Sequence, residues 1–273
     1  MGMYFAVPFV FPKEHIFMFN EIISIHQGTN FMRIAIISDI HGNQVAFEAV
    51  LRDLAQQAPI DEMVIAGDNC LNGPRPREVI KMLQDLKCPV LQGNVDEDIV
   101  TLRPKKGTKK RVMVEWTREQ IGQGGIKYLA SLPKTHLVQN PAQGAGSNVL
   151  VVHANPLNLY EAIFPSASEE TLEHYLGELD SSIGAVAFGH FHVAYIRRWQ
   201  DLLLVDAGSC GLPRDEDLRA SYALLTWQDG EWQAEHRRVP YDVDLVVRQM
   251  KESGMPNVEK RIKILTGASY AQK

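Results

Sequence analysis

The stretch Arg33-Ile34-Ala35-Ile36-Ile37-Ser38-Asp39-Ile40-His41-Gly42-Asn43 decides the fold of this chain. Its apolar first half is closed by Gly42, which predicts a buried strand followed by a turn and a helix. Side chains of a strand alternate between its faces, so Asp39 and His41 are predicted to point the same way at the end of this strand. A carboxylate and an imidazole so placed can share one metal ion. The alternative for this motif alone is that Asp39 caps the helix and His41 is a hydrogen-bonded turn residue.

Size and composition are those of a globular protein. The 273 residues are 45% hydrophobic and 22% charged, enough for one large domain or two small ones. The net charge of −5 argues against a protein that coats nucleic acid, because backbone binding needs an excess of Lys and Arg. Only Cys70, Cys88 and Cys210 occur, which fits a reducing compartment better than a disulfide-bonded secreted domain. We therefore expect a cytoplasmic protein.

Residues 1–31 differ from the rest of the chain. They are rich in Phe, Ile and Met, and none of their apolar runs reaches the roughly 20 residues that span a bilayer. Residues 1–7 contain no Lys or Arg, so they make a weak export signal, and we expect no membrane association. We treat 1–31 as an N-terminal extension of unknown role, either an upstream translation artefact or an arm that packs on a partner subunit of a homo-oligomer. Residues 32–255 are predicted to form one domain, and 256–273 a C-terminal tail.

Strands that end in polar residues recur along the chain. After a helix at 44–56, strands are predicted at 62–66, 89–91, 148–152 and 184–188, with helices at 77–86 and within 101–132. Further strands are predicted at 194–199, 201–205, 221–227 and 232–239, and a last helix at 242–252. The residues that follow five of these strands are Asp39, His41, Asp68, Asn94, His153, His190 and His192. Each alone is most simply a cap or a turn residue, but together they are enough donors for two ions that share one carboxylate.

The ordered motifs Asp-x-His-Gly-Asn, Gly-Asp-Asn, Gly-Asn-x-Asp, Val-His-Ala and Gly-His-x-His resemble those of the calcineurin-like metallophosphoesterases, from Arg33 to about Asp244. The segments 72–76, 206–215 and 238–242 resemble its bacterial branch of phosphodiesterases and diadenosine-tetraphosphatase-like proteins. The resemblance implies an α/β (α+β) fold, a four-layer α-β-β-α sandwich with two metals at the carboxyl ends of the central strands. It further implies that one metal takes Asp39, His41 and His192, that the other takes Asn94, His153 and His190, and that Asp68 bridges them.

The chemistry implied by this resemblance is hydrolysis. Two ions roughly 3.5–4 Å apart polarise a phosphoryl oxygen and lower the pKa of a bridging water, so that Asp39, Asp68, Asn94 and His153 act through the hydroxide formed. Nitrogen and oxygen ligands admit Mn, Fe, Zn, Co or Ni. We expect a small nucleotide-like substrate, a phosphodiester or a phosphoanhydride; a metal-binding scaffold with little turnover and a nuclease are the alternatives. Arg214 is a candidate phosphate contact, with a surface salt bridge to Asp215 or Asp217 as its alternative.

One residue departs from the family pattern. Many members read Gly-Asn-His-Asp or Gly-Asn-His-Glu, in which the histidine protonates the leaving group, whereas this chain has Val95 there. Loss of a general acid typically costs about 10²- to 10⁴-fold, most for alkoxide leaving groups of high pKa. Without the histidine to orient, Asp96 is predicted to cap a helix.

A chain that begins at Met32 is expected to fold and to keep its activity, because every proposed ligand lies after that residue. Circular dichroism and hydrolysis rates of the shortened and full-length chains, measured side by side, test this. Aggregation or loss of activity on shortening would show that residues 1–31 belong to the working assembly.

Overall fold

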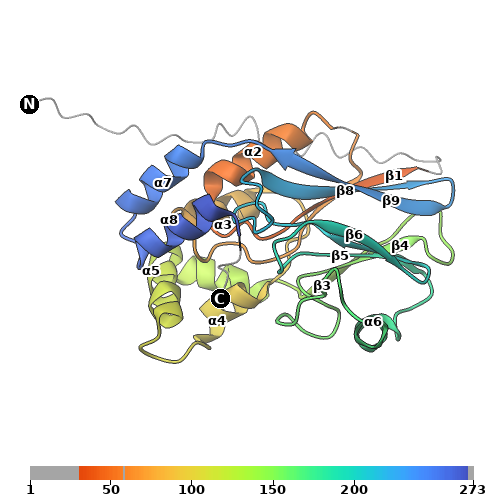
Figure 1. The fold of residues 1–273 in the computed structure, drawn as a ribbon, viewed down its shortest axis with the longest axis horizontal. Coiled ribbons are helices and arrows are strands. Elements are labelled where there is room, and N and C mark those ends of the chain that lie inside the picture. The colour runs from red at the N-terminus through yellow and green to blue at the C-terminus, as the bar shows by residue number, and fades with distance from the viewer. Residues whose placement is uncertain (1–30, 58, 270–273) are drawn as a thin grey trace, which may run out of the picture.

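The fold is built on two sheets that face each other (Figure 1). The computed structural model describes residues 31–57 and 59–269, so nearly all of the N-terminal extension lies outside the described residues. The first sheet has the order β2-β1-β8-β9 and contains β1 (Met32–Ile37), β2 (Glu62–Ile65), β8 (Ala220–Gln228) and β9 (Glu231–Val239). The second has the order β3-β4-β5-β7-β6 and contains β3 (Thr135–Val138), β4 (Asn148–Val152), β5 (Ile183–Phe188), β6 (Tyr195–Trp199) and β7 (Leu202–Asp206).

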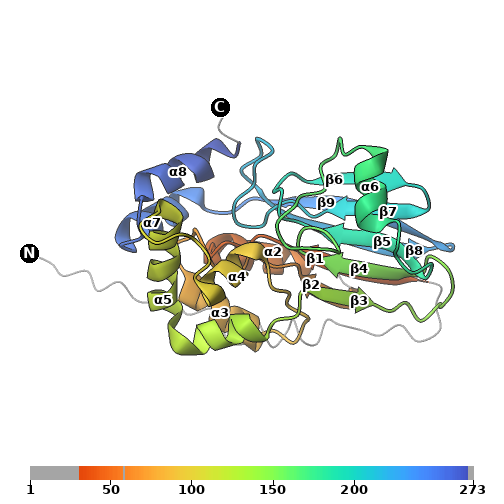
Figure 2. The ribbon, with the colours of Figure 1, turned by 90° about the horizontal axis from the view of Figure 1, so that it is seen from below.

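Helices cover the outer face of each sheet. The helices α2 (Gln44–Leu54) and α3 (Pro76–Asp85) pack on the first sheet, and α6 (Glu169–Leu176) packs on the second (Figures 1 and 2). The four-layer α-β-β-α sandwich predicted from the sequence is therefore confirmed.

Alternation along the strands creates the three apolar interfaces between these layers. In β1, Ile34 and Ile36 face the second sheet while Ala35 and Ile37 face α2 and α3. In β5, Ala185 and Ala187 face the first sheet, and Val186 and Phe188 face α6. Because both sheets are covered on both faces, their central strands read as continuous apolar runs. Each fully buried Ile or Val side chain contributes about 1.5–3 kcal/mol relative to exposure, which fixes the register of these strands.

Parallel pairing brings the strand ends together. β1 pairs in parallel with β2, and β5 pairs in parallel with both β4 and β7. The residues that follow these strands therefore emerge at one end of the sandwich. The predicted strand at 89–91 is reduced to an isolated parallel bridge between Ile65 and Val90, which extends the same edge.

A helical layer closes that end of the sandwich. It consists of α4 (Asn94–Thr101), α5 (Lys109–Ser131), α7 (Val243–Glu252) and α8 (Val258–Gly267). Helix α8 lies in the stretch 256–273, which is predicted from the sequence to be a C-terminal tail, and Leu265 on this helix is buried in the apolar cluster of the helical layer. The packed chain thus extends beyond residue 255; the helical spacing of Val258, Ile262 and Leu265 is the signal for it. None of the helices described has both the length and the apolarity of a membrane span.

Replacing Leu265 by Ala should lower the free energy of unfolding by about 2–5 kcal/mol, because a buried side chain is removed and a cavity remains. Urea unfolding followed by circular dichroism measures the change. The matched control is Lys263→Ala on the exposed face of the same helix, for which a change within about 0.5 kcal/mol is expected. Equal unfolding midpoints for the two variants would show that α8 does not contribute to the core.

Candidate metal centre

All seven predicted ligand residues meet at the carboxyl ends of the strands. Their donor atoms form two groups, in each of which the atoms lie within 4.8 Å of one another. The first group contains Asp39, His41, Asp68 and His192, and the second contains Asp68, His153 and His190. Asn94, the first residue of α4, joins the second group through its side-chain amide. Asp68 belongs to both groups.

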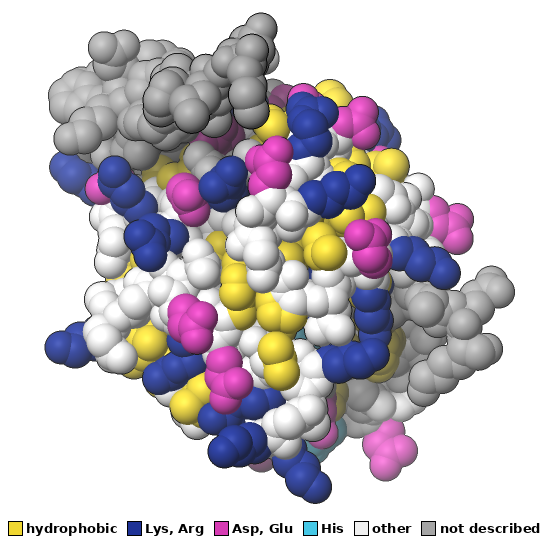
Figure 3. Space-filling view, turned by 90° about the vertical axis from the view of Figure 1, so that its left-hand side faces the viewer, with side chains coloured by type: hydrophobic (Ala, Val, Ile, Leu, Met, Phe, Trp, Pro, Cys, Tyr) yellow, Lys and Arg dark blue, Asp and Glu magenta, His cyan; other side chains and the backbone are white. Residues whose placement is uncertain are grey.

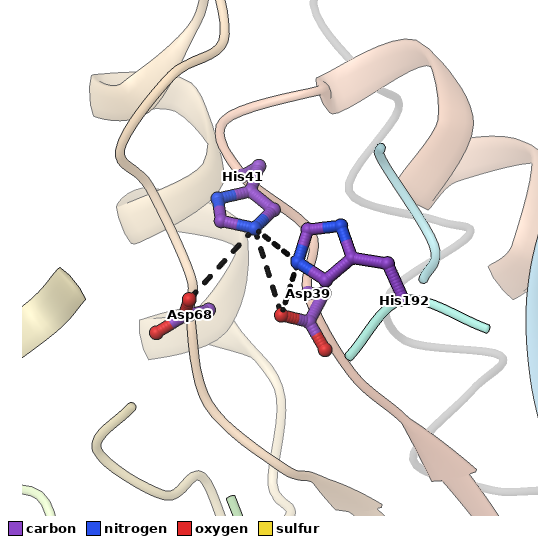
Figure 4. A group of neighbouring side chains, drawn as sticks. All are labelled: Asp39, His41, Asp68 and His192. Carbon is purple, nitrogen blue, oxygen red and sulfur yellow. Dashed lines mark hydrogen bonds and ion pairs between the residues drawn. The ribbon is translucent and has the colours of Figure 1, made fainter. Parts of the chain in front are cut away.

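In the first group the donor atoms point at one another (Figure 4). The Nε2 atoms of His41 and His192 are 3.1 Å apart. Asp39 Oδ1 lies 3.0 Å from His192 Nε2 and 3.5 Å from His41 Nε2. Asp68 approaches from the opposite side, with Oδ2 at 3.8 Å from His41 Nε2.

In the second group the donor atoms also lie close to one another. His153 Nε2 is 3.2 Å from His190 Nδ1 and 3.3 Å from Asp68 Oδ1. One terminal atom of the Asn94 side-chain amide is 3.1 Å from both ring nitrogens; in the orientation with its nitrogen there, the amide donates to both rings and to Asp68. Asp68 thus directs Oδ1 towards His153 and Oδ2 towards His41.

Main-chain carbonyls fix the orientation of all four imidazoles. The ring nitrogen that faces away from each group lies at hydrogen-bond distance from a carbonyl oxygen: His41 Nδ1 at 2.9 Å from Leu71, His153 Nδ1 at 2.8 Å from Ala66, His190 Nε2 at 3.0 Å from Tyr160, and His192 Nδ1 at 2.6 Å from Leu212. A carbonyl accepts only, so the outward nitrogen carries the proton in each neutral ring. The inward nitrogen then presents a lone pair. Outer hydrogen bonds of this kind orient histidines that bind metals.

The donor set fits a divalent cation. Asp39 Oδ1 is buried and accepts no hydrogen bond from any residue in the described part of the chain. The inward nitrogens of His192 and His41 lie 3.0 Å and 3.5 Å from this oxygen. Lone pairs that converge in a buried site need a cation, or a proton, to offset their repulsion. The Asp68 carboxylate adds negative charge on the other side.

Burial and charge shift the pKa values of the site in opposite directions. Burial alone would raise the pKa of Asp39, but His192 and His41 hold that pKa well below its usual value. The Asp39 carboxylate in turn raises the pKa of His192 despite its burial, so without a metal ion this pair favours a proton on His192. Burial lowers the pKa of His153 and His190, which favours the neutral imidazole, whose inward nitrogen can donate its lone pair to a metal ion. Burial, together with the Asp39 charge, raises the pKa of Asp68. The two carboxylates therefore oppose each other's ionisation unless positive charge lies between them.

The backbone of the site is held in an unusual conformation. Five of the seven residues have left-handed φ values: Asp39 at 56°, His41 at 52°, Asp68 at 55°, His190 at 70° and His192 at 63°. Each non-glycine residue in this region costs roughly 1–2 kcal/mol, although Asp, Asn and His tolerate it best. Strain of this kind concentrates at functional sites, where the surrounding structure imposes it.

Close approach of the loops requires glycine at two positions. A Cβ atom on Gly93 would lie 2.2 Å from Asp68 Oδ1, and one on Gly67 would lie 2.9 Å from His153 Nδ1. Backbone hydrogen bonds join the same loops, with Asp39 N donating to Gly67 O at 3.0 Å. The glycines of the sequence motifs therefore let the strand ends approach each other.

The capping alternative for the first motif is wrong. Asn43, not Asp39, caps α2, because its side-chain oxygen accepts a hydrogen bond from Ala46 N at 3.1 Å. The prediction that Asp96 caps a helix is confirmed, since its carboxylate accepts from Gly93 N at the start of α4. The same carboxylate accepts from the main-chain and side-chain nitrogens of Asn69.

Arg214 reaches the site through its backbone. Its main-chain nitrogen donates to His192 O at 3.0 Å, and its Nη1 donates to Ser269 O at 3.0 Å. Asp215 is bound by Arg238, and Asp217 by Arg219. The phosphate contact predicted for Arg214 stays a prediction.

Sequence reasoning missed several supporting groups. The Ser38 hydroxyl donates to Asp39 Oδ2 at 2.7 Å, and the His190 main-chain nitrogen donates to the same atom at 2.8 Å. Ser38 directly precedes Asp39 in the sequence, and this position could have indicated that its hydroxyl supports the Asp39 carboxylate. The four carbonyl acceptors carry no sequence signal, because every residue has one.

The family follows from a comparison of the whole sequence with known protein families. Residues 32–230 match the model of the calcineurin-like phosphoesterase superfamily domain. The chain belongs to this superfamily. The superfamily and the buried Asp and His cluster together identify a metal-dependent phosphoesterase, and hence a hydrolase.

Three known proteins match more than four fifths of the chain. A protein of Methanocaldococcus jannaschii described as uncharacterized is 27% identical over 242 residues, which cover 82% of this chain and 93% of that protein. The crystal structure of a metallophosphoesterase from Sphaerobacter thermophilus is 27% identical with a TM-score of 0.69, covering 87% of this chain and 99% of that one. A hypothetical protein from Pyrococcus horikoshii is 21% identical with a TM-score of 0.73, covering 88% and 100%, and supports the fold.

Replacing Asp68 by Asn should weaken metal binding in both groups at once, because a carboxylate that faces both is lost. Elemental analysis of the purified protein after dialysis measures the metal content. His192→Ala and His190→Ala are the matched controls, each expected to weaken one group only. Two tightly held ions and an unchanged rate in Asp68→Asn would contradict the assignment of this residue.

Proposed function

We propose that the protein hydrolyses phosphodiesters or nucleotide phosphoanhydrides with two divalent transition metal ions. The observation that carries this proposal is the position of Asp68, whose two oxygens face two separate groups of histidines. In this proposal Asp39, His41 and His192 hold one ion, Asn94, His153 and His190 hold the other, and Asp68 contacts both.

The donor chemistry supports Mn, Fe, Zn, Co or Ni. All seven side chains offer nitrogen or oxygen, a set that suits borderline divalent ions. Burial raises the pKa of the Cys70 and Cys210 thiols, so both remain protonated and neither supplies a thiolate. The cysteines of the chain are free, which supports the proposed cytoplasmic location.

The residues of the chain position the reacting groups. When bound, two such ions polarise a phosphoryl oxygen and lower the pKa of a water molecule that attacks the phosphorus. The four imidazoles, fixed by main-chain carbonyls, hold their inward nitrogens in one arrangement, which avoids reorganisation during the reaction. The Val95 side chain is buried in the apolar cluster of the helical layer and cannot donate a proton to the leaving group. Substrates whose leaving groups need no proton are therefore favoured.

A nuclease is less well supported. Lys105, Lys106 and Lys109 are exposed, but Lys110 pairs with Asp98 and Arg111 pairs with Glu115. On the face that carries α5, α7 and α8, acidic and basic side chains are interspersed (Figure 3). A backbone-binding surface would need a continuous basic area.

A substrate screen with the metal-reconstituted protein tests the proposal. It compares monoesters, diesters, cyclic nucleotides and dinucleoside polyphosphates, with metal content measured on the same samples. Metal-dependent turnover of a diester or an anhydride supports the proposal. Two bound ions without turnover would favour a metal-binding scaffold, and polynucleotide cleavage that falls steeply with salt would favour a nuclease.

The buried Val95 leads to a prediction on leaving groups. The protein should hydrolyse bis-p-nitrophenyl phosphate well, because nitrophenolate leaves without a proton, and alkyl monoesters poorly. Val95→His should raise alkyl monoester rates by about 10-fold, less than the 10²-fold or more of a well-placed acid, because the Asp96 carboxylate that would orient the imidazole already binds Gly93 and Asn69. The diester rate should change little.

Val95→Leu is the control for altered packing at this position and should raise neither rate. Steady-state rates on both substrates decide the outcome. A parent protein that already prefers alkyl monoesters, or a Val95→His variant that accelerates both substrates equally, would contradict the role given to Val95.

A further inference from the structure

A long loop borders the second group of histidines. Residues 153–168, between β4 and α6, form neither helix nor strand. Loops of this length inside a domain are uncommon and are usually functional. This loop begins at His153, and the carbonyl of Tyr160 within it lies 3.0 Å from His190 Nε2.

Internal hydrogen bonds hold the loop in one conformation. The side chain of Asn155 donates to the Glu161 carbonyl at 2.6 Å, and the side-chain oxygen of Asn158 accepts from the main-chain nitrogens of Tyr160 and Glu161. The Tyr195 hydroxyl donates to the Ile163 carbonyl at 2.6 Å. Side chains that the loop exposes are thus presented on a fixed backbone.

One of these exposed side chains is aromatic and packs against the residue that lies between His190 and His192 in the chain. Phe164 is 46% exposed, although its neighbour Ile163 is buried. Its ring contacts that of Phe191, with centroids 4.7 Å apart and planes at 82°. Phe191 lies between His190 and His192 in the chain, so the pair adjoins residues from both groups of donors.

The other aromatic ring of the loop is already covered. Arg103 lies over the ring of Tyr160, with its guanidinium carbon 3.9 Å from the ring centroid, and the Tyr160 hydroxyl donates to Glu97. The Phe164 side chain has no polar atom, so its exposure to water is unfavourable. A fixed, exposed phenyl ring that contacts Phe191, the chain neighbour of two predicted ligands, is therefore suited to contact a ligand.

We propose that Phe164 and Phe191 form a stacking subsite for an aromatic group of the substrate, such as the base of a nucleotide. This subsite rests on the proposed function, because the phosphate must bind at the metal centre for the aromatic group to reach the rings. Stacking tolerates any base, since every base has a π face, so the subsite selects nucleotides as a class.

Calorimetric titration of the metal-loaded full chain with two matched probes tests the subsite. Adenosine 5′-monophosphate and ribose 5-phosphate carry the same phosphate on the same sugar and differ in the base. The nucleotide should bind about 10-fold more tightly, in keeping with the contribution of base stacking. Phe164→Leu should remove most of this preference and leave the affinity for ribose 5-phosphate unchanged.

Leu157→Ala is the matched control, because Leu157 is exposed on the same loop and should alter neither affinity. Equal affinities for the two probes in the parent protein, or equal weakening of both in Phe164→Leu, would overturn the subsite. If Phe164→Leu instead dissociates an oligomer in sedimentation while the preference persists, the pair is an interface between copies of the chain. A loaded protein that neither binds ribose 5-phosphate nor hydrolyses a diester would overturn the proposed function as well.

Discussion

The hydrogen bonds from four imidazoles to main-chain carbonyls are the interactions on which the centre depends. In the neutral ring, each leaves one nitrogen without a proton and aims it inward, so that lone pairs and carboxylate oxygens converge in a buried space. Such an arrangement is unfavourable without positive charge, because buried acceptors that face one another lose hydration and gain no hydrogen bond. The folded protein without an ion therefore includes the unfavourable free energy of these buried, mutually repelling acceptors.

The apolar interfaces of the sandwich can offset this unfavourable free energy. Five left-handed residues add several kcal/mol of backbone strain, roughly 1–2 kcal/mol for each. Each buried aliphatic side chain in the central strands contributes about 1.5–3 kcal/mol, and the three apolar interfaces contain many of them. Loops tied to such strands cannot relax without disturbing the register, which keeps the strained residues in place.

Local patterns made much of this predictable. Strand β1 and the residues after it follow from an apolar run closed by glycine, and β4 agrees with its predicted bounds. Within each sheet, parallel pairing brings the polar residues together, because parallel strands end at the same edge. The packing of the two sheets on each other then brings these two sets of residues to one site. The carbonyl partners of the histidines could not be predicted, since they come from loops distant in sequence. The pairing of Phe164 with Phe191 depends likewise on how two loops after different strands meet, and α8 was missed although its apolar spacing is helical.

Val95 connects the core of the protein to the chemistry of the centre. It follows Asn94 at the start of α4, donates its main-chain N–H to Asp68 Oδ1 at 3.0 Å, and buries its side chain among the helices. The backbone at this position therefore supports the metal centre while the side chain stabilises the helical layer. An imidazole here would have to give up that apolar contact to reach the substrate, and the neighbouring Asp96 is already committed to Asn69 and Gly93. The apolar packing of α4 thus supports the proposal that the centre acts on leaving groups that depart without a proton.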